Sequence, residues 1–522
     1  MKTRQLLFAF AMLMPISKIS FAQGTFQKSV GGSMFEYGYA MQKTADGGYV
    51  VGASTSSFGA NGVDFYVIKY DANCTALWNK IYDNAGTAAE PINDIFQTTD
   101  RGYIVGGYTQ HLPNVFAYIV KTDSIGDTLW TRYWGRMDTT YSDCYLVTQT
   151  SDGNVLIGGY TTSYGAGMED AFLLKLNVNT GDTLWTRVWG GPQNEWLYSM
   201  QETADGGIIL AGLTNSFGAG DNDILLIKTD ANGNIEWAKA YGDTASQFGY
   251  GHCLQQTSDH GYIITGNGGF LLKTDSIGTV QWQKTYNGSF TFTGHAVQQT
   301  TDGGYIVGGS KSNGTSKACL IKTDSVGNVS WSMFYGGTSG ELCFAIKQAD
   351  DGGYFMSGQT SSFGTGNDIY LVKTDANGIS GCNESTANAV ASFSNYSTAN
   401  APLQVNYGSQ TQHPTVSILT GYQEISLCST VGTSEFIPST PYIAISTNPF
   451  STFTTLNLQG TCHNPSLFIY NLLGQVVETY YNTSLPNQQI TIPRNQLSSG
   501  MYFYKVIDEN KEVLGIGKMI IE

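Results

Sequence analysis

The stretch Thr203-Ala-Asp-Gly-Gly-Ile-Ile-Leu-Ala-Gly212 begins a unit that recurs along the chain and decides its fold. It is followed by Asp223-Ile-Leu-Leu-Ile-Lys-Thr-Asp230 and, after a second turn, by Ile235-Glu-Trp-Ala-Lys-Ala-Tyr-Gly242. Asp205-Gly206 and Asn232-Gly233 predict tight turns, because the hairpin turns that match strand twist need residues that adopt positive φ. The segments between them are short and rich in β-branched and aromatic residues, which is typical of strands. We therefore expect a small antiparallel sheet of three or four strands.

The same pattern occurs seven times. Its first turn is marked by an Asp that recurs every 43 to 54 residues: Asp46, Asp100, Asp152, Asp205, Asp259, Asp302 and Asp351. A Lys ends the second apolar segment of each unit: Lys69, Lys121, Lys175, Lys228, Lys273, Lys322 and Lys373. Six units carry a Trp in the third segment: Trp78, Trp130, Trp185, Trp237, Trp282 and Trp331. Periods of this length with about four strands per unit predict a β-propeller.

The two ends of the repeat region are complementary. Residues 26–32 and 36–42 resemble the second half of a unit, whereas the seventh unit has only the first half, residues 352–358 and 368–375. Two such halves can form one sheet and close a ring, which pairs the strand edges that an open array would expose. The predicted fold is thus all-β: a seven-bladed β-propeller over residues 23–380 whose last blade combines both ends.

The loop between the first two strands varies most among the units. We expect these loops on one rim of the ring, and insertions confined to one face often mark a binding face. Some of the loops carry carboxylates that either cap turns or bind Ca²⁺ through oxygen ligands: Asp64, Asp170, Asp221, Asp223 and Asp368. No EF-hand spacing occurs, so no metal, cofactor or catalytic residue is assigned, and Ca²⁺ is kept as an open possibility.

Other repeated side chains have structural interpretations. Each strand-ending Lys is expected to pair with a nearby Asp, the alternative being a ring of cations around the channel. The repeated Asp is expected to stabilise its own turn, and the Trp side chains to pack between blades. Trp134, Trp189 or Trp196, if exposed, would instead be candidates for stacking on sugars. His252 and His295 align in adjacent units without metal-ligand spacing.

Composition and the N-terminal residues bear on localisation. The formal net charge of −15 argues against nucleic-acid binding. Residues 1–22 have a basic start, an apolar run and Ser20-Phe21-Ala22 before a cleavage point, as in a secretory signal peptide. No later segment has about 20 consecutive apolar residues, so no transmembrane segment is expected in the mature chain.

Two further regions follow the repeats. Residues 381–440 are rich in Ser and Thr and are expected to form a linker or a small β module. Cys382 and Cys428 lie within this region, and a disulfide between them after export is left open. Cys144, Cys253 and Cys343 are expected to be small buried residues. Residues 441–522 contain six or seven short apolar segments between turns, which predicts an Ig-like β-sandwich.

The C-terminal stretch resembles a known sorting domain. Its matching motifs are Asn448-Pro449-Phe450, residues 467–476, residues 497–506 and residues 517–521. Together they resemble the type IX (Por) secretion system sorting domain of Bacteroidetes, type A. This resemblance implies transit through the periplasm, handling by the type IX machinery through residues 441–522, and then removal of the domain, with attachment to the outer-membrane surface or release.

The repeats are similar to those of secreted Bacteroidetes propellers with a T-x-D-G-G-Y…K-T-D…G-x-x-x-W pattern, a resemblance that implies no chemistry. The leading hypothesis is a non-enzymatic, secreted or cell-surface propeller that binds a glycan or protein at its loop rim. Two alternatives are a secreted glycan-active hydrolase or lyase on the same scaffold, and a structural or adhesion component of the cell surface.

Overall fold

The computed structural model divides the chain into two compact units, Met1–Thr430 and Val431–Glu522. It describes residues 24–521 with these internal gaps: 60–61, 85–88, 138–139, 244–250, 394–396, 407–416, 420–423, 431–442, 446–451, 459–465, 472–475, 482–488, 495–496 and 508–512. The expected signal peptide, residues 1–22, lies outside the described residues. None of the described segments is a helix with the length and apolarity needed to span a bilayer.

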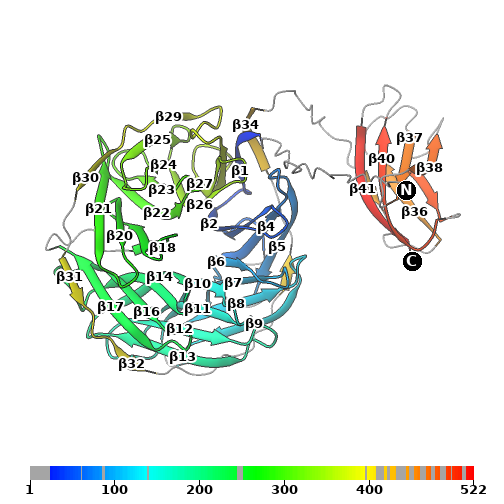
Figure 1. Ribbon diagram of the computed structural model, residues 1–522. Coiled ribbons are helices and arrows are strands. Elements are labelled where there is room, and N and C mark those ends of the chain that lie inside the picture. Colours follow the sequence, from blue (N-terminus) through cyan, green and yellow to red (C-terminus); the bar gives the residue numbers. More distant parts are fainter. Residues whose placement is uncertain are drawn as a thin grey trace, which may run out of the picture. The chain divides into compact units, whose positions relative to one another are not determined.

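The described strands of the first unit form seven antiparallel sheets arranged in a ring (Figure 1). Sheet 1 contains β2 (Glu36–Lys43), β3 (Tyr49–Thr55), β4 (Asp64–Tyr70), β5 (Ala76–Asp83) and β33 (Ser417–Leu419). Sheet 2 contains β6 (Ile92–Gln97), β7 (Tyr103–His111), β8 (Asn114–Thr122) and β9 (Thr128–Trp134). Sheet 3 contains β10 (Ser142–Gln149), β11 (Val155–Thr161), β12 (Asp170–Leu176), β13 (Thr183–Gly190) and β32 (Gln404–Asn406). Sheet 4 contains β14 (Glu195–Glu202), β15 (Ile208–Thr214), β16 (Asp223–Thr229), β17 (Ile235–Gly242) and β31 (Ser397–Asn400).

The remaining sheets follow the same plan. Sheet 5 contains β18 (Gly251–Gln256), β19 (Tyr262–Gly266), β20 (Phe270–Thr274), β21 (Val280–Asn287) and β30 (Val390–Phe393). Sheet 6 contains β22 (Phe292–Gln299), β23 (Tyr305–Lys311), β24 (Lys317–Thr323), β25 (Val329–Tyr335) and β29 (Glu384–Thr386). Sheet 7 contains β26 (Glu341–Gln348), β27 (Tyr354–Thr360), β28 (Asp368–Thr374), β1 (Thr25–Val30) and β34 (Glu424–Thr430). The first strand of each list lies nearest the centre of the ring (Figure 1).

Sheet 7 joins the two ends of the repeat region. β1 pairs antiparallel with β28, with Phe26 opposite Lys373 and Val30 opposite Ile369. The expectation that both ends share one sheet is therefore confirmed. Closure supplies β28 with a hydrogen-bonded neighbour on its outer side, so the ring has no unpaired junction at this point.

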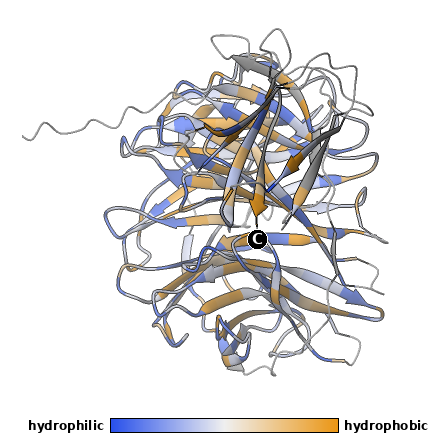
Figure 2. Ribbon diagram, turned by 90° about the vertical axis from the view of Figure 1, so that its right-hand side faces the viewer, coloured by the Kyte–Doolittle hydropathy of each residue, from blue (hydrophilic) through white to orange (hydrophobic). Residues whose placement is uncertain are grey.

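The middle strands of each sheet are buried on both faces. Every residue of β3 and β4 is buried, because sheet 1 packs between two other sheets. The sequences of these strands are therefore nearly continuous apolar runs rather than alternating ones. In Figure 2, the hydrophobic segments, drawn in orange, lie largely within strands. Trp side chains of outer strands contact Tyr side chains of the next sheet, with ring centroids 5.6 Å apart for Trp78 and Tyr103 and 6.1 Å apart for Trp237 and Tyr262. The expected packing of Trp between sheets is confirmed.

All seven strand-ending lysines are buried, and each forms an ion pair with an Asp. Their Nζ atoms lie 2.7–3.2 Å from the carboxylates of the turn aspartates, in the pairs Lys69–Asp46, Lys121–Asp100, Lys175–Asp152, Lys228–Asp205, Lys273–Asp259, Lys322–Asp302 and Lys373–Asp351. Burial favours the neutral acid, but hydrogen bonds from Thr44 and Lys69 outweigh it and lower the pKa of Asp46 to about 2. The expected pairing is confirmed. The Asp that follows two residues after six of these lysines has another role: Asp71, for example, accepts hydrogen bonds from the amides of its own turn.

The structure differs from the expectation for residues 381–440. The described strands of 384–430 are neither a linker nor a separate module, because each pairs with the outer edge of a sheet of the ring (Figure 1). We call this segment the belt. It adds β29 to sheet 6, β30 to sheet 5, β31 to sheet 4, β32 to sheet 3, β33 to sheet 1 and β34 to sheet 7. Its strands are three to seven residues long, so no one of them would stand out as an independent strand in the sequence.

A disulfide lies where the belt begins. Cys382 is disulfide-bonded, and its Sγ lies 3.7 Å from the carbonyl oxygen of Leu427 in β34. The side chain of Cys428, whose pairing with Cys382 was left open from the sequence, lies outside the described residues. The five free cysteines of the described residues include Cys144 and Cys343, which are buried as expected, and Cys253, which is partly buried.

The second unit consists of two antiparallel sheets. The first contains β35 (Ile443–Ile445), β36 (Phe453–Leu458) and β39 (Gln489–Pro493). The second contains β38 (Val476–Tyr481), β37 (Ser466–Tyr470), β40 (Gly500–Ile507) and β41 (Val513–Ile521). Ile492 of the first sheet belongs to the same buried cluster as Leu467, Val506 and Met519 of the second. The two sheets therefore enclose a common apolar core.

Candidate functional site

A β-bulge interrupts the innermost strand of every sheet in the ring. The pairing register with the second strand shifts at one place in each, as between Leu197 and Ser199 in β14. The residues at these shifts are Tyr39, Asn93, Tyr145, Tyr198, His252, His295 and Phe344. A bulge leaves its extra residue out of the ladder and re-aims that side chain.

Glycine in the second strand makes room for the bulge. Gly212 stands opposite Leu197, and a Cβ at Gly212 would lie 1.8 Å from the carbonyl oxygen of Trp196. In sheet 7, a Cβ at Gly358 would likewise lie 1.9 Å from the carbonyl oxygen of Leu342. In sheets 2, 3, 4, 6 and 7 the glycine at this position therefore lets the inner strand approach closely and turn its bulged residue inward.

Six of the bulged side chains form an aromatic collar around the channel. Their ring centroids are 5.0–5.5 Å apart in an unbroken series of contacts that runs Tyr39, Phe344, His295, His252, Tyr198 and Tyr145. The seventh position is Asn93 of sheet 2, which donates a hydrogen bond of 2.8 Å to Asp143. The collar thus has one polar gap, at sheet 2.

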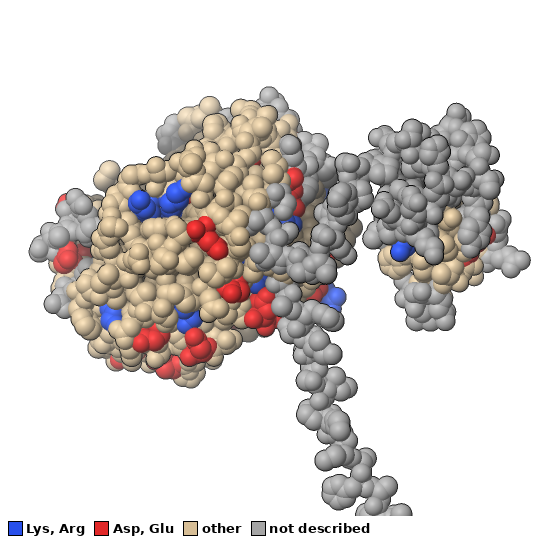
Figure 3. Space-filling model, turned by 90° about the horizontal axis from the view of Figure 1, so that it is seen from above, with Lys and Arg blue, Asp and Glu red and all other residues tan. Residues whose placement is uncertain are grey.

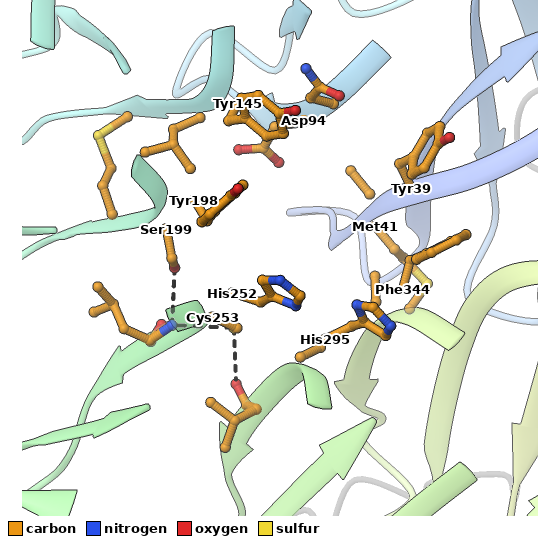
Figure 4. A pocket seen from close by; sticks show the side chains of 18 of the residues that line it. Tyr39, Met41, Asp94, Tyr145, Tyr198, Ser199, His252, Cys253, His295 and Phe344 are labelled. Atoms are coloured by element: carbon orange, nitrogen blue, oxygen red, sulfur yellow. Dashed lines mark hydrogen bonds between the residues drawn. The ribbon is translucent and has the colours of Figure 1, made fainter. Parts of the chain in front are cut away.

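The collar lines a cavity of about 710 Å³. Figure 4 shows the labelled aromatic side chains and Asp94 around this space. Asp94 and Lys347 are the charged residues among its described lining. Burial raises the pKa of Asp94 to about 7, although its carboxylate accepts hydrogen bonds from the amides of Ile95 and Val147 and lies near the Lys347 charge. The cavity therefore combines aromatic faces with polar side chains, and its described lining holds a single acid, whose pKa lies near neutrality.

The two histidines of the collar are neutral at physiological pH. His252 and His295 stack with centroids 5.2 Å apart and planes 10° from parallel. Burial lowers the pKa of His252 to about 4, and burial together with the neighbouring His252 lowers that of His295 to about 3. They act here as flat aromatic surfaces. Their alignment in the sequence therefore reflects a shared position in the channel.

A second group of aromatic side chains leads from the loop rim into the collar. Tyr160 stacks on Trp196 with centroids 4.8 Å apart, and on Tyr141 at 5.6 Å. Trp196 also contacts Tyr198 of the collar at 6.1 Å, and its Nε1 donates a 2.7 Å hydrogen bond to Glu169. Because Trp196 follows the first residue of β14, this group lies at the rim that carries the variable loops.

The structure leaves only some of the residues named from the sequence available for ligand binding. Trp134 and Trp189 are fully buried and cannot stack on a ligand, whereas Trp196 is partly exposed in the rim group. Asp170 and Asp223 accept hydrogen bonds from amides of their own loops and so act as turn caps; Asp221 is exposed. Sequence reasoning missed the collar, yet aligning the seven inner strands would have shown aromatic residues at one position in six of them.

The raised pKa of Asp94 has a measurable consequence. The folded protein holds this proton up to about pH 7, whereas the unfolded chain releases it near 3.8, so stability from Asp94 falls as pH rises between these values. The variant Asp94→Asn lacks this pH-dependent contribution to stability, because an amide does not titrate in this range. We therefore expect its stability relative to the wild type to improve as pH increases from 5 to 8, measured by urea unfolding. A difference between the two proteins that does not change with pH would contradict the shift.

Comparisons with known proteins bear on both units. Residues 445–522 match the family model of the secretion system C-terminal sorting domain. No curated protein matches the chain in sequence. Among solved structures, Sqt1 of Chaetomium thermophilum, bound to the N-terminus of ribosomal protein L10, is 10% identical with a TM-score of 0.42, covering 66% of this chain and 98% of that one.

Two bacterial structures were also found. A protein of unknown function from Dyadobacter fermentans is 12% identical with a TM-score of 0.41, covering 68% of this chain and 99% of that one. PorZ, a surface component of the type IX secretion system of Porphyromonas gingivalis, is 11% identical with a TM-score of 0.38, covering 94% of this chain but 59% of that one. The family match confirms the resemblance drawn from the C-terminal motifs: residues 445–522 are a sorting domain of the type IX secretion system.

Proposed function

We propose that the first unit is a seven-bladed β-propeller that binds a glycan in its channel, reached from the loop rim. The observation that carries the proposal is the aromatic collar, in which six sheets each contribute one inward-facing ring. The sorting domain indicates secretion by the type IX system to the cell surface or extracellular space. The second unit, with its two sheets around one core, is proposed to be Ig-like.

The chemistry of the channel favours a neutral sugar chain over a charged ligand. Aromatic faces bind the apolar faces of sugar rings, whereas the cavity offers one carboxyl and one ammonium group for polar contacts. Figure 3, which views the ring from its side, shows a surface with few charged side chains, both acidic and basic. A cavity of about 710 Å³ is in the range of small-ligand sites. A protein ligand that inserts an aromatic or apolar side chain is the other candidate.

A screen of the full-length protein against neutral polysaccharides and matrix proteins tests the proposal. Tyr198→Ala and Trp196→Ala should weaken binding about 10-fold or more, since a stacked ring contributes roughly 1–3 kcal/mol in comparable base-stacking sites. Phe393→Ala is the matched control, because Phe393 is 81% exposed on β30 of the belt, at the outer edge of sheet 5, and its loss should leave affinity unchanged. Binding that survives both channel substitutions would refute the channel site, and binding of protein but not glycan would change the ligand class.

One observation keeps a catalytic alternative in view. Asp94 has a pKa of about 7, which suits a general acid. Glycoside hydrolysis normally needs two carboxyl groups flanking the scissile bond, however, and Asp94 is the one carboxylate in the described lining. Release of reducing sugar by the wild type but not by Asp94→Asn would favour this alternative over simple binding. A purely structural or adhesive role would give neither binding to soluble glycans nor turnover.

A further inference from the structure

Three buried carboxylates meet where sheet 1 and sheet 2 adjoin at the loop rim. Asp64 begins β4, Asp83 ends β5, and Glu90 lies two residues before β6. One oxygen of each lies within 4.8 Å of the others. Their exposed fractions are 1%, 6% and 0%. Three acids this close and this far from water repel one another unless protons or a cation offset their charge.

Two oxygens of this cluster have no hydrogen-bond donor. Asp64 Oδ1 and Glu90 Oε2 are buried and unpartnered, although the other oxygen of Glu90 accepts a 3.0 Å bond from Thr109. The equivalent Glu195 of sheet 4 differs, since it accepts bonds from the Gly191 amide at 2.6 Å and from Thr214 at 2.7 Å. Asp223 and Asp368, which begin the equivalent strands of sheets 4 and 7, also have an unpartnered Oδ1, so the feature particular to this junction is the free Glu90 oxygen next to Asp83. A buried oxygen without a donor is costly, and beside two other carboxylates the missing partner would be positive.

Another junction of the ring already places a cation at the same point. Lys317 begins β24 and so occupies in sheet 6 the position that Asp64 occupies in sheet 1. Its Nζ lies 3.0 Å from Glu341 of sheet 7, the counterpart of Glu90. The fold therefore accommodates a positive charge between the third strand of one sheet and the Glu of the next.

Asp83 places a carboxylate at a position where most other sheets have glycine. Phe65 pairs with Tyr82, so Asp83 stands opposite Asp64. The residue at this position is glycine in five other sheets: Gly31, Gly135, Gly190, Gly242 and Gly336. In sheet 3 a Cβ at Gly190 would lie 1.5 Å from the Asp170 carboxylate. A side chain here is thus directed at the aspartate of its own sheet, and sheet 1 supplies a third carboxylate.

We propose that Asp64, Asp83 and Glu90 bind a divalent cation, with Ca²⁺ as the best match. Ca²⁺ binds carboxylate oxygens at about 2.3–2.6 Å, so two of its ligands are at most about 5 Å apart, and the observed limit of 4.8 Å fits without rearrangement. Three carboxylates provide up to six oxygens, which approaches the number that Ca²⁺ prefers. The ion would fix β6 just ahead of Asn93, the polar gap of the collar.

The protonation of the cluster agrees with this assignment. Burial chiefly raises the pKa of Asp64 to about 7 and that of Glu90 to about 8, and the neighbouring acids add to the shift. Burial also raises the pKa of Asp83. Tyr118, whose pKa is raised by burial and by Glu90 and Asp83, is the other titratable group facing them. Without a cation the three groups cannot all be ionised near neutral pH, and a bound ion would displace the protons.

The test is a calcium titration of the full-length protein after removal of metals by a chelator. Calorimetry should give a saturable signal, and Ca²⁺ at about 100 times its Kd should raise the Tm by about 2–5 °C. Asp83→Gly installs the residue found in five of the other six sheets, so it should fold normally and lose both signals. Asp170→Asn is the matched control at the junction of sheets 3 and 4, and it should keep them.

The outcomes separate the proposal from its rivals. Absence of heat and of a Tm shift in the wild type would overturn it and show that the acids share protons instead. A calcium response that persists in Asp83→Gly would also overturn it, because the ion would then bind elsewhere. A response in the wild type and in Asp170→Asn, lost in Asp83→Gly and in Asp64→Asn, would establish the site independently of any glycan.

Discussion

Replacing Asp351 with alanine is expected to lower the free energy of unfolding by about 3–5 kcal/mol, the cost of leaving a buried charge without its partner. Lys373 is fully buried, and its Nζ lies 2.8 Å from Asp351. The side chain of Asp351 is 13% exposed, against 50–63% for the turn aspartates of the other six pairs. Without Asp351 the ammonium group keeps only neutral partners such as the Thr374 carbonyl oxygen. Urea unfolding at neutral pH measures the change.

Asp205→Ala is the matched control. Its partner Lys228 is equally buried but also lies 3.0 Å from Glu236, so it keeps a negative partner after the substitution. We expect a loss of about 1 kcal/mol there, as for a partly exposed pair. Equal losses in the two variants would mean that the lysine is stabilised by its carbonyl contacts rather than by the carboxylate.

Removing the disulfide of Cys382 should destabilise the first unit by about 2–4 kcal/mol. Cys382 lies two residues before β29, the first strand of the belt. The described strands of the belt are short and pair with the sheets through few residues each, as in the three pairs between β33 and β5. Cys382→Ser should therefore speed amide exchange along β29–β34 more than in the inner strands. Thermal unfolding and hydrogen exchange measure the two effects.

A reducing agent provides the control for this variant. It should lower the Tm of the wild type to that of Cys382→Ser and leave the variant unchanged, because the five other described cysteines are free. An equal effect of reductant on both proteins would show that the stabilising bond does not involve Cys382. Uniform exchange throughout the ring would show that the belt does not open separately.

The ring was predictable because its signals are local and repeated. The Asp of the first turn, the Lys that ends the second strand and the Trp of the third recur seven, seven and six times, and each reports on contacts within a sheet or with the next one. Even the sharing of sheet 7 could be expected, because residues 26–32 match the missing half of the last unit. A motif that would be weak evidence for the fold in one unit becomes strong evidence when it recurs in most of them.

The belt and the candidate site could not be predicted in the same way. β32 and β33 are three residues long, and their pairing depends on edges supplied by sheets 3 and 1, more than 200 residues earlier in the chain. The collar depends on bulges that no single strand reveals, and the acidic cluster depends on Asp83 lying opposite Asp64 after folding. These features arise from tertiary register, which composition and local periodicity do not encode.

The belt also bears on how this protein behaves when many copies are crowded together. The outer edge of an isolated sheet offers free amide and carbonyl groups that invite strand addition from a neighbouring molecule, a common route to aggregation. Six of the seven described sheets already have that edge occupied by the chain's own residues. Because the chain pairs these edges with its own strands, neighbouring copies would be kept from adding a strand to them.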